Sequence, residues 1–286
     1  MTARKKLLLI DGHGLLFQMF FGMPREIKGR NGQPVQGVIG FIGALLKSAR
    51  LIRPDNLLII FDSEVPCFRN SMRPEYKSNR QRDFSKADDS QNPFTQLPII
   101  QTALDELGCK HCEAEGVEAD DLIAAYAAAF QNSHDIVIWS ADSDLLQLVN
   151  DRVTIFRYRG KASSFCDRNE FENKYGFSPE LMADYKALRG DSADGLPGVP
   201  GVGHETARKI IRHYGPLEQL YQNLAQMPSG KMKQKLIAHR ELVSGNYGLI
   251  KLRADWARLF TPDDLAVNPQ TFEHKTMVVL DRIKAI

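Results

Sequence analysis

Carboxylates stand directly after three apolar runs of the chain, where short buried strands are expected to end. Asp11 follows LLLI, Asp62 follows LLIIF, and IVIWSA runs into a pair of acids, Asp142 and Asp144. In an open α/β sheet, ligands bind in the crevice beyond the carboxyl ends of the parallel strands. We therefore expect these acids, distant in sequence, to meet at one edge of a sheet.

Five more acids stand at a helix start and in a turn. Glu118, Asp120 and Asp121 open the alanine-rich segment EADDLIAAYAAAF, in which positions 118 and 121 share one face of a helix. Asp191 and Asp194 lie in LRGDSADGLPG, at a spacing that suits two carboxylates presented from one turn.

Each of these acids has an ordinary alternative role. An Asp after a strand is commonly a cap, acids in a first helical turn complement the helix dipole, and an Asp between glycines forms Asx-turns. Nine carboxylates on one rim, however, would repel one another strongly at neutral pH, so a cation must offset them. Ligation by oxygen alone favours Mg²⁺ or Mn²⁺. We interpret His13, the only histidine near this site in the sequence, as a polar residue beside the turn.

Two hard cations held by carboxylates are suited to phosphodiester hydrolysis. A polyanionic substrate fits the irregular segment 63–98, in which aromatic residues stand among cations: Arg69, Arg73, Tyr76, Lys77, Arg80, Arg82 and Phe84. A solvated basic loop is the alternative for this segment.

A second signal for nucleic acid is LPGVPGVGHETARKII at 196–211. Its glycines, Gly198, Gly201 and Gly203, predict a tight turn that leads into a helix beginning near residue 204. Backbone N–H groups at such a helix start bind phosphate, and basic residues on the helix extend the contact: Arg208, Lys209 and Arg212. Contacts of this kind position a duplex without reading its sequence. The alternative is a plain glycine turn between packed helices.

The elements that must position these residues alternate in the first half of the chain. Runs at 5–10, 56–61, 135–140 and 153–158 are typical of buried strands, and patterns at 36–52, 97–108 and 118–130 are typical of helices. This alternation predicts an α/β fold with a mostly parallel central sheet and helices on both faces. We divide the chain into an α/β core at 1–165, with an insertion at about 63–98, and an all-helical region at 166–286.

The composition, with 43% hydrophobic and 25% charged residues, is typical of a globular protein. No apolar run approaches the roughly 20 residues of a membrane span. LLLI is too short for a secretory signal, so we expect a cytoplasmic protein with no membrane partner.

Cys109 and Cys112 form a C-x-x-C without a second pair, and we interpret them as incidental thiols at a helix-to-strand turn rather than a redox pair or half a zinc site.

The motifs that carry these residues resemble the 5′ nuclease (flap endonuclease) family, in unbroken order over about residues 5–255. This family includes the N-terminal domain of bacterial DNA polymerase I, phage 5′ exonucleases and free-standing bacterial homologues. The motifs are LLLIDGHGLLF, IIFDSEVPCFR, EYKSNR, GVEADDLIA, SADSDLLQL, YKALRGDSADGLPGVPGVG and TARKII. The resemblance implies a PIN-like core, a helical arch and a helix–three-turn–helix at about 185–215.

The resemblance also implies two groups of metal ligands, some acting through water. The first is Asp11, Asp62, Glu118, Asp120 and Asp121, and the second is Asp142, Asp144, Asp191 and Asp194. Lys77 and Arg80 match the family's catalytic basic pair near the scissile phosphate, and a K⁺ ion is implied in the duplex-binding turn, at Val199 and Val202.

The implied activity is that of a structure-selective 5′→3′ exonuclease and flap endonuclease that hydrolyses DNA near junctions of 5′ single strand and duplex. Two or more Mg²⁺ ions, replaceable by Mn²⁺, would be its cofactors, and its partner would be branched or 5′-flapped DNA. We expect a monomer acting at the bacterial nucleoid in primer removal or repair. The starting Met and the extension past the matched region favour a free-standing enzyme over a polymerase fragment.

Two positions depart from the family pattern. Gln18 stands where the family usually carries an Arg, and Gly195 replaces a frequent Asn.

Two other functions stay open: a PIN-type ribonuclease, which shares acids at strand ends, and a non-catalytic protein that binds branched DNA. The insertion and the glycine turn argue against the first, and the presence of all nine acids argues against the second.

Overall fold

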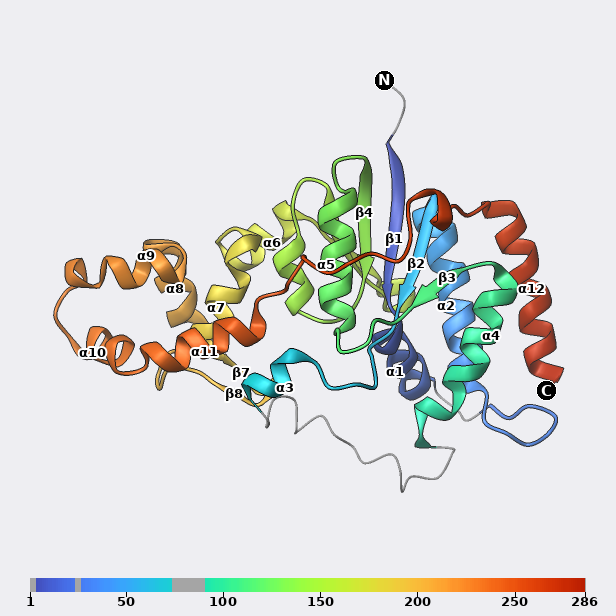
Figure 1. Ribbon diagram of the computed structural model, residues 1–286, viewed down its shortest axis with the longest axis horizontal. Helices are drawn as coiled ribbons and strands as arrows, with labels where there is room; N and C mark the ends of the chain where they lie inside the picture. Colours follow the sequence, from blue (N-terminus) through green and yellow to red (C-terminus); the bar gives the residue numbers. More distant parts are fainter. Residues whose placement is uncertain (1–3, 24–26, 74–90, 286) are drawn as a thin grey trace.

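The computed structural model describes residues 4–23, 27–73 and 91–285 of the chain. At its centre is a six-stranded sheet in the order β3-β2-β1-β4-β5-β6, parallel except for β6, which pairs antiparallel with β5 (Figure 1). The strands are β1 (Lys5–Asp11), β2 (Asn56–Ile60), β3 (Lys110–Cys112), β4 (His134–Trp139), β5 (Val153–Arg157) and β6 (Ser164–Cys166). The mostly parallel sheet is therefore confirmed, whereas β3 and β6 are too short to show a period in the sequence.

Strand side chains alternate between two buried clusters, one on each face of the sheet. In β1, Leu7 and Leu9 join the first cluster, while Leu8 and Ile10 join the second. This follows from the two-residue period of a strand, and burial on both faces explains why the strands read as continuous apolar runs. The second cluster is covered by α1 (Gly12–Gly22), α2 (Gln36–Ile52), α4 (Leu97–Leu107) and α12 (Pro269–Ala285).

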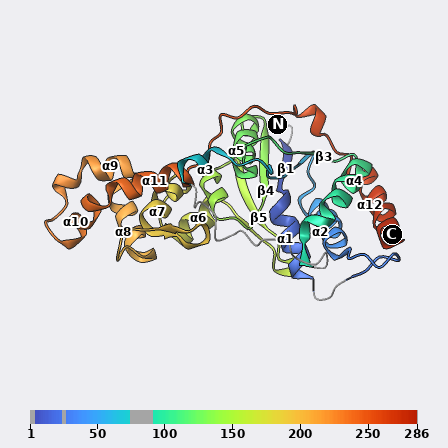
Figure 2. The same ribbon diagram turned by 60° about the horizontal axis from the view of Figure 1, so that its bottom comes forward.

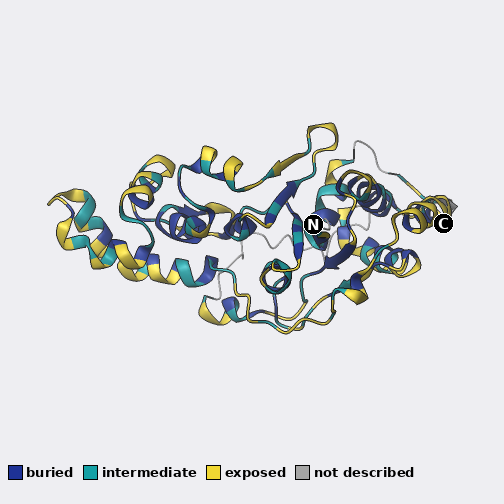
Figure 3. Ribbon diagram, turned by 90° about the horizontal axis from the view of Figure 1, so that it is seen from above, coloured by how far each residue is buried: buried dark blue, intermediate teal, exposed yellow. Residues whose placement is uncertain are grey.

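The first cluster lies under α5 (Ala119–Phe130) and continues without a break into a helical region. That region extends from one end of the sheet (Figures 1 and 2). Its elements are α6 (Arg168–Tyr175), α7 (Met182–Arg189), β7 (Gly190–Asp191), β8 (Leu196–Pro197), α8 (His204–Tyr214), α9 (Leu217–Gln222), α10 (Lys231–Ala238) and α11 (Arg240–Ile250). The burial colours in Figure 3 show the strands and the helix sides facing them as buried.

The helix patterns at 36–52, 97–108 and 118–130 match α2, α4 and α5 to within one residue. The insertion predicted at 63–98 therefore ends inside α4. Its described parts hold α3 (Phe68–Met72) and the 3₁₀ turn η4 (Pro93–Gln96). Several predicted site residues lie outside the described residues: Tyr76, Lys77, Arg80, Arg82 and Phe84.

The last part of the chain differs from the predicted division at 166. After α11 the chain returns along the α/β core, where Val267 N–H donates to the Asp55 carbonyl at 2.9 Å. Helix α12 then packs on α2 and α4, at the opposite end from α8–α10 (Figures 1 and 2). Phe272, Val279 and Ile283 are buried there. Residues 269–285 thus belong to the core, because their apolar stripe completes the second cluster.

The C-x-x-C cysteines lie on opposite faces of the sheet. Cys109 belongs to the second cluster and Cys112 to the first. Burial raises the pKa of each thiol to about 12, which makes both unreactive. Both cysteines are free, in agreement with the interpretation as incidental thiols, although only Cys109 lies at the helix-to-strand turn and Cys112 ends β3. Among the described helices, none combines the length and apolar character needed to cross a membrane.

Candidate active site

Asp11 lies where β1 meets α1, at the carboxyl edge of the sheet. Its side chain caps α1 by accepting from Gly14 N–H at 2.7 Å, and it also accepts from the Ser140 hydroxyl at 2.8 Å. Burial, followed by the negative charge of Asp62, raises the pKa of Asp11 to about 6, and Asp142 adds to the effect. Asp11 therefore both caps α1 and lies near the acids that follow other strands.

Asp62 joins the end of β2 to the start of α5. Its Oδ1 accepts from Ala119 N–H at 2.8 Å, next to Glu118, the N-cap residue of that helix. Asp62 N–H donates to His13 Nδ1 at 2.9 Å, so Nδ1 acts as an acceptor. His13 thus supports the backbone of the turn, in agreement with its interpretation as a polar neighbour. Asp120 lies half-buried in the first turn of α5.

Arg69 is placed differently from the prediction that it contacts DNA. Its side chain is only 1% exposed. Its guanidinium donates to both oxygens of Asp121 and, at 3.0 Å, to Glu118. Its other donors reach the carbonyls of Leu249 and Lys251. The prediction for Arg69 is corrected: a buried guanidinium bound to carboxylates and carbonyls serves as a counter-ion inside the protein and is not placed on a surface open to DNA.

Asp121 is accordingly enclosed rather than open to a ligand. Its carboxylate is fully buried, and besides Arg69 it accepts from Arg253 N–H at 2.8 Å. Arg69 therefore offsets the charge of Asp121, while the other acids of the first group lie closer to the surface. Its assignment as a metal ligand stays a prediction.

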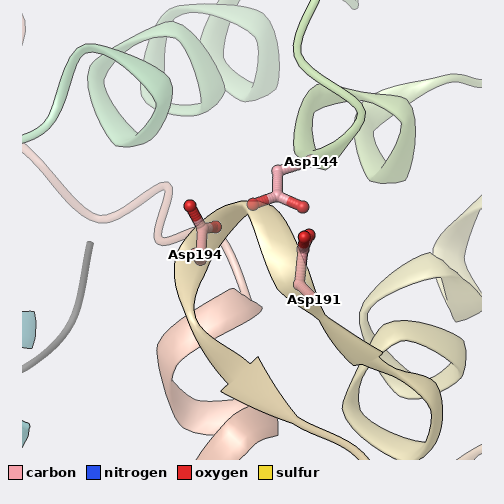
Figure 4. Close-up of side chains that lie close together, drawn as sticks. All are labelled: Asp144, Asp191 and Asp194. Atoms are coloured by element: carbon pink, nitrogen blue, oxygen red, sulfur yellow. The ribbon is translucent and has the colours of Figure 1, made fainter. Parts of the chain in front are cut away.

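The second acidic group gathers from three elements. Asp142 and Asp144 stand at the start of the 3₁₀ turn η5 (Asp144–Leu148), and Asp191 ends β7. Asp194 closes the turn between β7 and β8. Ligand atoms of Asp144, Asp191 and Asp194 all lie within 4.8 Å of one another, and the three buried side chains point to a common space (Figure 4). The sequence spacing of 191 and 194 predicted this presentation from one turn.

Lys186 on α7 is a member of this group that the sequence analysis missed. Its ammonium forms ion pairs with Asp144 and, at 2.6 Å, with Asp191, and it donates to the Ser143 hydroxyl at 3.0 Å. Burial would lower the pKa of Lys186, but the two carboxylates raise it to about 12. No clear sequence signal marks this role, because α7 also carries Asp184 and Arg189.

The pKa values of the two carboxylates paired with Lys186 are shifted in opposite directions. Burial, reinforced by Asp142, raises the pKa of Asp144 to about 6 despite the ion pair with Lys186. Burial would also raise the pKa of Asp191, but the Lys186 ammonium and the Ala193 N–H hold it below its usual range. The group thus carries more negative charge than one lysine offsets.

The donors that converge within 4.8 Å here are all carboxylate oxygens. No described cysteine or histidine belongs to this group. Oxygen donors and excess negative charge fit a hard divalent cation. Burial raises the pKa values of Asp11 and Asp144, and repulsion from neighbouring carboxylates, which such a cation would relieve, adds to the effect. The second acidic group therefore fits a divalent cation, whereas among the described residues the acids of the first group do not come together within 4.8 Å as a set of three.

Beside the first acidic group is an open recess of about 480 Å³. Asp62 and Glu118 line one part of it, and the aromatic rings of His13, Phe17 and Phe94 line another. The Phe94 ring is 41% exposed and lies edge-on to both other rings at 5.5 Å between centroids. The exposed aromatic surface of the recess suits a nucleotide base, because each base offers a face for stacking.

The glycine turn is held by close backbone packing. A Cβ on Gly198 would lie 2.0 Å from the Arg189 carbonyl oxygen, whereas nothing lies within 4 Å of a Cβ on Gly203. Gly203 is the N-cap residue of α8 and is exposed, as a phosphate site at that helix start requires. Gly201 has a φ of +82° and is exposed. The turn and the helix start near 204 are therefore as expected, with Gly198 in a structural position.

Lys235 of α10 reaches the same turn, where its ammonium donates to the Pro200 carbonyl at 2.8 Å. The side chains of Val199 and Val202 are buried, and Val202 N–H donates to the Val199 carbonyl at 2.9 Å. Lys235 was not among the predicted site residues. Its spacing in the basic segment KMKQK gave no indication that it would reach the turn.

The other predicted DNA contacts lie at the surface to different degrees. Lys209 is exposed on α8, and Arg208 forms an ion pair with Glu205 at 2.7 Å. Arg73 is half-buried at the end of α3. Gln18, at the position where the family usually carries an Arg, donates its amide to the Tyr158 carbonyl and so ties α1 to the segment after β5.

Two family models match adjacent parts of the chain. The 5′-3′ exonuclease N-terminal resolvase-like domain matches residues 6–176, and the 5′-3′ exonuclease C-terminal SAM fold matches residues 177–273. Their boundary lies after α6, about ten residues beyond the predicted boundary at 165.

Curated relatives are DNA polymerases I of bacteria. The thermostable enzyme of Thermus aquaticus is 35% identical over 254 residues, which cover 87% of this chain and 29% of that protein. The enzyme of Mycobacterium tuberculosis is 37% identical over 277 residues, which cover 95% of this chain and 30% of that protein. The chain thus spans about 30% of the length of these relatives.

Solved structures share the fold. The 5′-exonuclease of bacteriophage T5 with bound zinc superposes with a TM-score of 0.73 at 22% identity, covering 98% of this chain and all of that one. The catalytic core of Rad2 in complex with a DNA substrate superposes with a TM-score of 0.60 at 17% identity, covering 98% and 93%. At these identities the likeness concerns the fold alone.

Proposed function

This chain belongs to the 5′-3′ exonuclease family, and from that premise we propose that it is a structure-selective 5′→3′ exonuclease and flap endonuclease. The observation that carries the proposal is the convergence of Asp144, Asp191 and Asp194 within 4.8 Å, near the acids that follow β1 and β2 at the carboxyl edge of a parallel sheet. Beside them lie a recess with aromatic walls and a glycine turn opening a basic helix. Acid groups, single-strand recess and phosphate site are the parts that cleavage at a 5′ junction requires.

Mg²⁺ or Mn²⁺ would be held by the carboxylates of the two groups. When bound, such cations activate water and stabilise the charge on the attacking and leaving oxygens of a phosphodiester. The chain's own contribution is positional. Ser140 and Gly14 N–H orient Asp11, Ala119 N–H orients Asp62, and the β7–β8 turn presents Asp191 beside Asp144. Lys77 and Arg80, outside the described residues, remain proposed contacts of the scissile phosphate.

The DNA would be held at two places. The unpaired 5′ nucleotide enters the recess and stacks on Phe94, and the duplex binds the start of α8 through its phosphates, with Lys209 extending the contact. A K⁺ ion bound by carbonyls of the turn at Val199 and Val202 would strengthen that phosphate contact. Because phosphates and stacking carry no base code, binding would depend on DNA shape. The protein would act as a monomer in the bacterial cytoplasm, at the nucleoid.

Product mapping on an end-labelled 5′-flap substrate tests the activity. We expect cleavage near the junction in Mg²⁺, yielding products with a 5′-phosphate, and none in EDTA. A single-stranded RNA of equal length serves as the comparison substrate. Preferential cleavage of RNA would instead identify a PIN-type ribonuclease, and binding of the flap without any cleavage would identify a DNA-binding protein.

The double variant Asp142→Asn and Asp144→Asn tests the site. It should lose cleavage while it keeps flap affinity, since these acids bind cations rather than the duplex. Robust hydrolysis by this variant would refute the assignment of the second group.

A further inference from the structure

Lys186 is the only lysine among the buried residues of the described chain. It is 3% exposed, and its ammonium pairs with Asp144 and with Asp191 at 2.6 Å. A buried ammonium keeps its place only where carboxylates compensate for its lost hydration. Lys186 is therefore fixed between two of the acids that a second-group cation would use.

The oxygens of Asp144, Asp191 and Asp194 converge within 4.8 Å, in the space shown in Figure 4. Both Asp144 and Asp191 direct an oxygen at Lys186. A divalent cation must approach each ligand oxygen to about 2.0–2.6 Å, and a dication held by these three carboxylates would strongly repel the ammonium that lies against two of them. We propose that Lys186 is the built-in counter-ion of the second acidic group and that a divalent cation binding there must displace it.

Charge explains what such a lysine does. Without a cation, the three buried carboxylates would face one another with three negative charges, and one ammonium lowers this repulsion enough for β7, η5 and α7 to pack together. With a cation, the ion pairs must break first, so their loss is subtracted from the binding free energy. Lys186 thereby stabilises the metal-free protein and raises the cation concentration at which the second group fills.

The inference rests on the proposed metal-dependent function, and Lys186→Met separates the two. Methionine has a similar length and no charge. Mn²⁺ binding without DNA is measured by isothermal titration calorimetry on wild type, on Lys186→Met and on Lys47→Met, a matched change of an exposed lysine on α2. Lys186→Met should bind a second-group Mn²⁺ at least tenfold more tightly than wild type. Lys47→Met should behave as wild type.

Two further measurements assign the effect. Adding Asp191→Asn to Lys186→Met should remove the gained affinity, which places the gain at the second group. The midpoint of thermal unfolding of Lys186→Met should fall below that of wild type in EDTA and recover in Mn²⁺. Unchanged Mn²⁺ affinity in Lys186→Met would overturn the displacement. If wild type bound no Mn²⁺ at all, the metal-dependent function itself would fall as well.

If Lys186→Met does not fold, the wild-type protein can still show whether a divalent cation displaces Lys186. Amine labelling by reductive methylation, read by mass spectrometry, should leave Lys186 protected in EDTA and label it in Mg²⁺, while labelling of Lys47 stays constant. Equal protection of Lys186 in both conditions would overturn the proposal.

Discussion

Arg69 is the residue at which charge and burial matter together. Its guanidinium joins Asp121 and Glu118 of α5 to the carbonyls of Leu249 and Lys251 beyond α11. Removing one partner of a buried ion pair leaves an uncompensated charge, at a cost of about 3–5 kcal/mol. We predict that Arg69→Met lowers the free energy of unfolding by about that amount, as measured by urea denaturation without metal.

The matched comparison is Arg50→Met, which breaks the exposed pair of Arg50 with Glu273 and should cost about 0–1 kcal/mol. Replacing Asp121 by Leu in the Arg69→Met background should restore part of the loss, because the buried charge is then gone. A loss below about 1 kcal/mol in Arg69→Met would contradict a role as counter-ion.

His134, the first residue of β4, gives a prediction about pH. Burial, followed by the positive charges of Lys5 and Arg4, lowers the pKa of His134 below 6.5. Asp55 and a hydrogen bond with Phe130 oppose the shift. The unfolded chain then takes up a proton at higher pH than the folded one. His134 therefore contributes stability that is present above pH 6.5 and is lost as the pH falls through its folded pKa.

We predict that wild type loses more unfolding free energy than His134→Gln between about pH 7.5 and about pH 5.5. Urea denaturation at both pH values measures the difference, and His274→Gln, at an exposed position of α12, provides the comparison. Equal pH dependence of wild type and His134→Gln would show that the buried imidazole plays no part.

At the level of elements, the glycine turn separates packing from binding. The β7–β8 pair brings Gly198 against Gly190 and the Arg189 carbonyl, so a methyl group at Gly198 has no space. Gly203 has open space and a φ of −83° that any residue adopts. We predict that Gly198→Ala costs about 1–3 kcal/mol by overpacking, whereas Gly203→Ala meets no neighbour and costs only the weaker N-cap preference of alanine.

Thermal unfolding and flap affinity together check this prediction. Gly203→Ala should lower the midpoint of unfolding less than Gly198→Ala does. It should bind the flap more weakly than wild type, since it places a methyl group beside the exposed helix start. Gly198→Ala should lower the midpoint and also disturb Asp191, which pairs with Leu196 in the same hairpin. A normal midpoint for Gly198→Ala would refute the close packing.

The sequence predicted elements better than contacts. Apolar runs fix their own strands because burial on both faces demands continuous hydrophobicity, so β1, β2, β4 and β5 were all found. The carboxylates at strand ends were predicted correctly because the carboxyl ends of parallel strands lie at the same edge of a sheet. Arg69 was misread because its acids, Glu118 and Asp121, lie 49 and 52 positions away along the chain. Lys186 was missed because Asp144, one of its two acidic partners, lies 42 positions away. No local pattern distinguishes a cation that binds phosphate from one that is buried against an acid.

At the level of the whole molecule, the first cluster joins the α/β core to the helical region as one hydrophobic body. It runs from Leu7 and Ile138 of the sheet to Leu220 and Leu236 near the far end. Gln147 reinforces the join, because its amide donates to the Ile250 carbonyl at 3.1 Å and its carbonyl accepts from Leu252 N–H at 2.9 Å. Two family models thus cover what physically is a single core.

We therefore predict one cooperative unfolding transition for the chain. Leu236 is fully buried in α10, and Leu236→Ala should cost about 2–5 kcal/mol. Trp139 is the last residue of β4, in the α/β core. The chain has two tryptophans, so in a Trp256→Phe background the fluorescence reports on the α/β core alone. Leu236→Ala should lower the urea midpoint from Trp139 fluorescence as much as the midpoint from far-ultraviolet circular dichroism. If the fluorescence midpoint stayed at the wild-type value, the helical region would unfold independently, and the shared core would not couple the duplex-binding turn to the acidic groups.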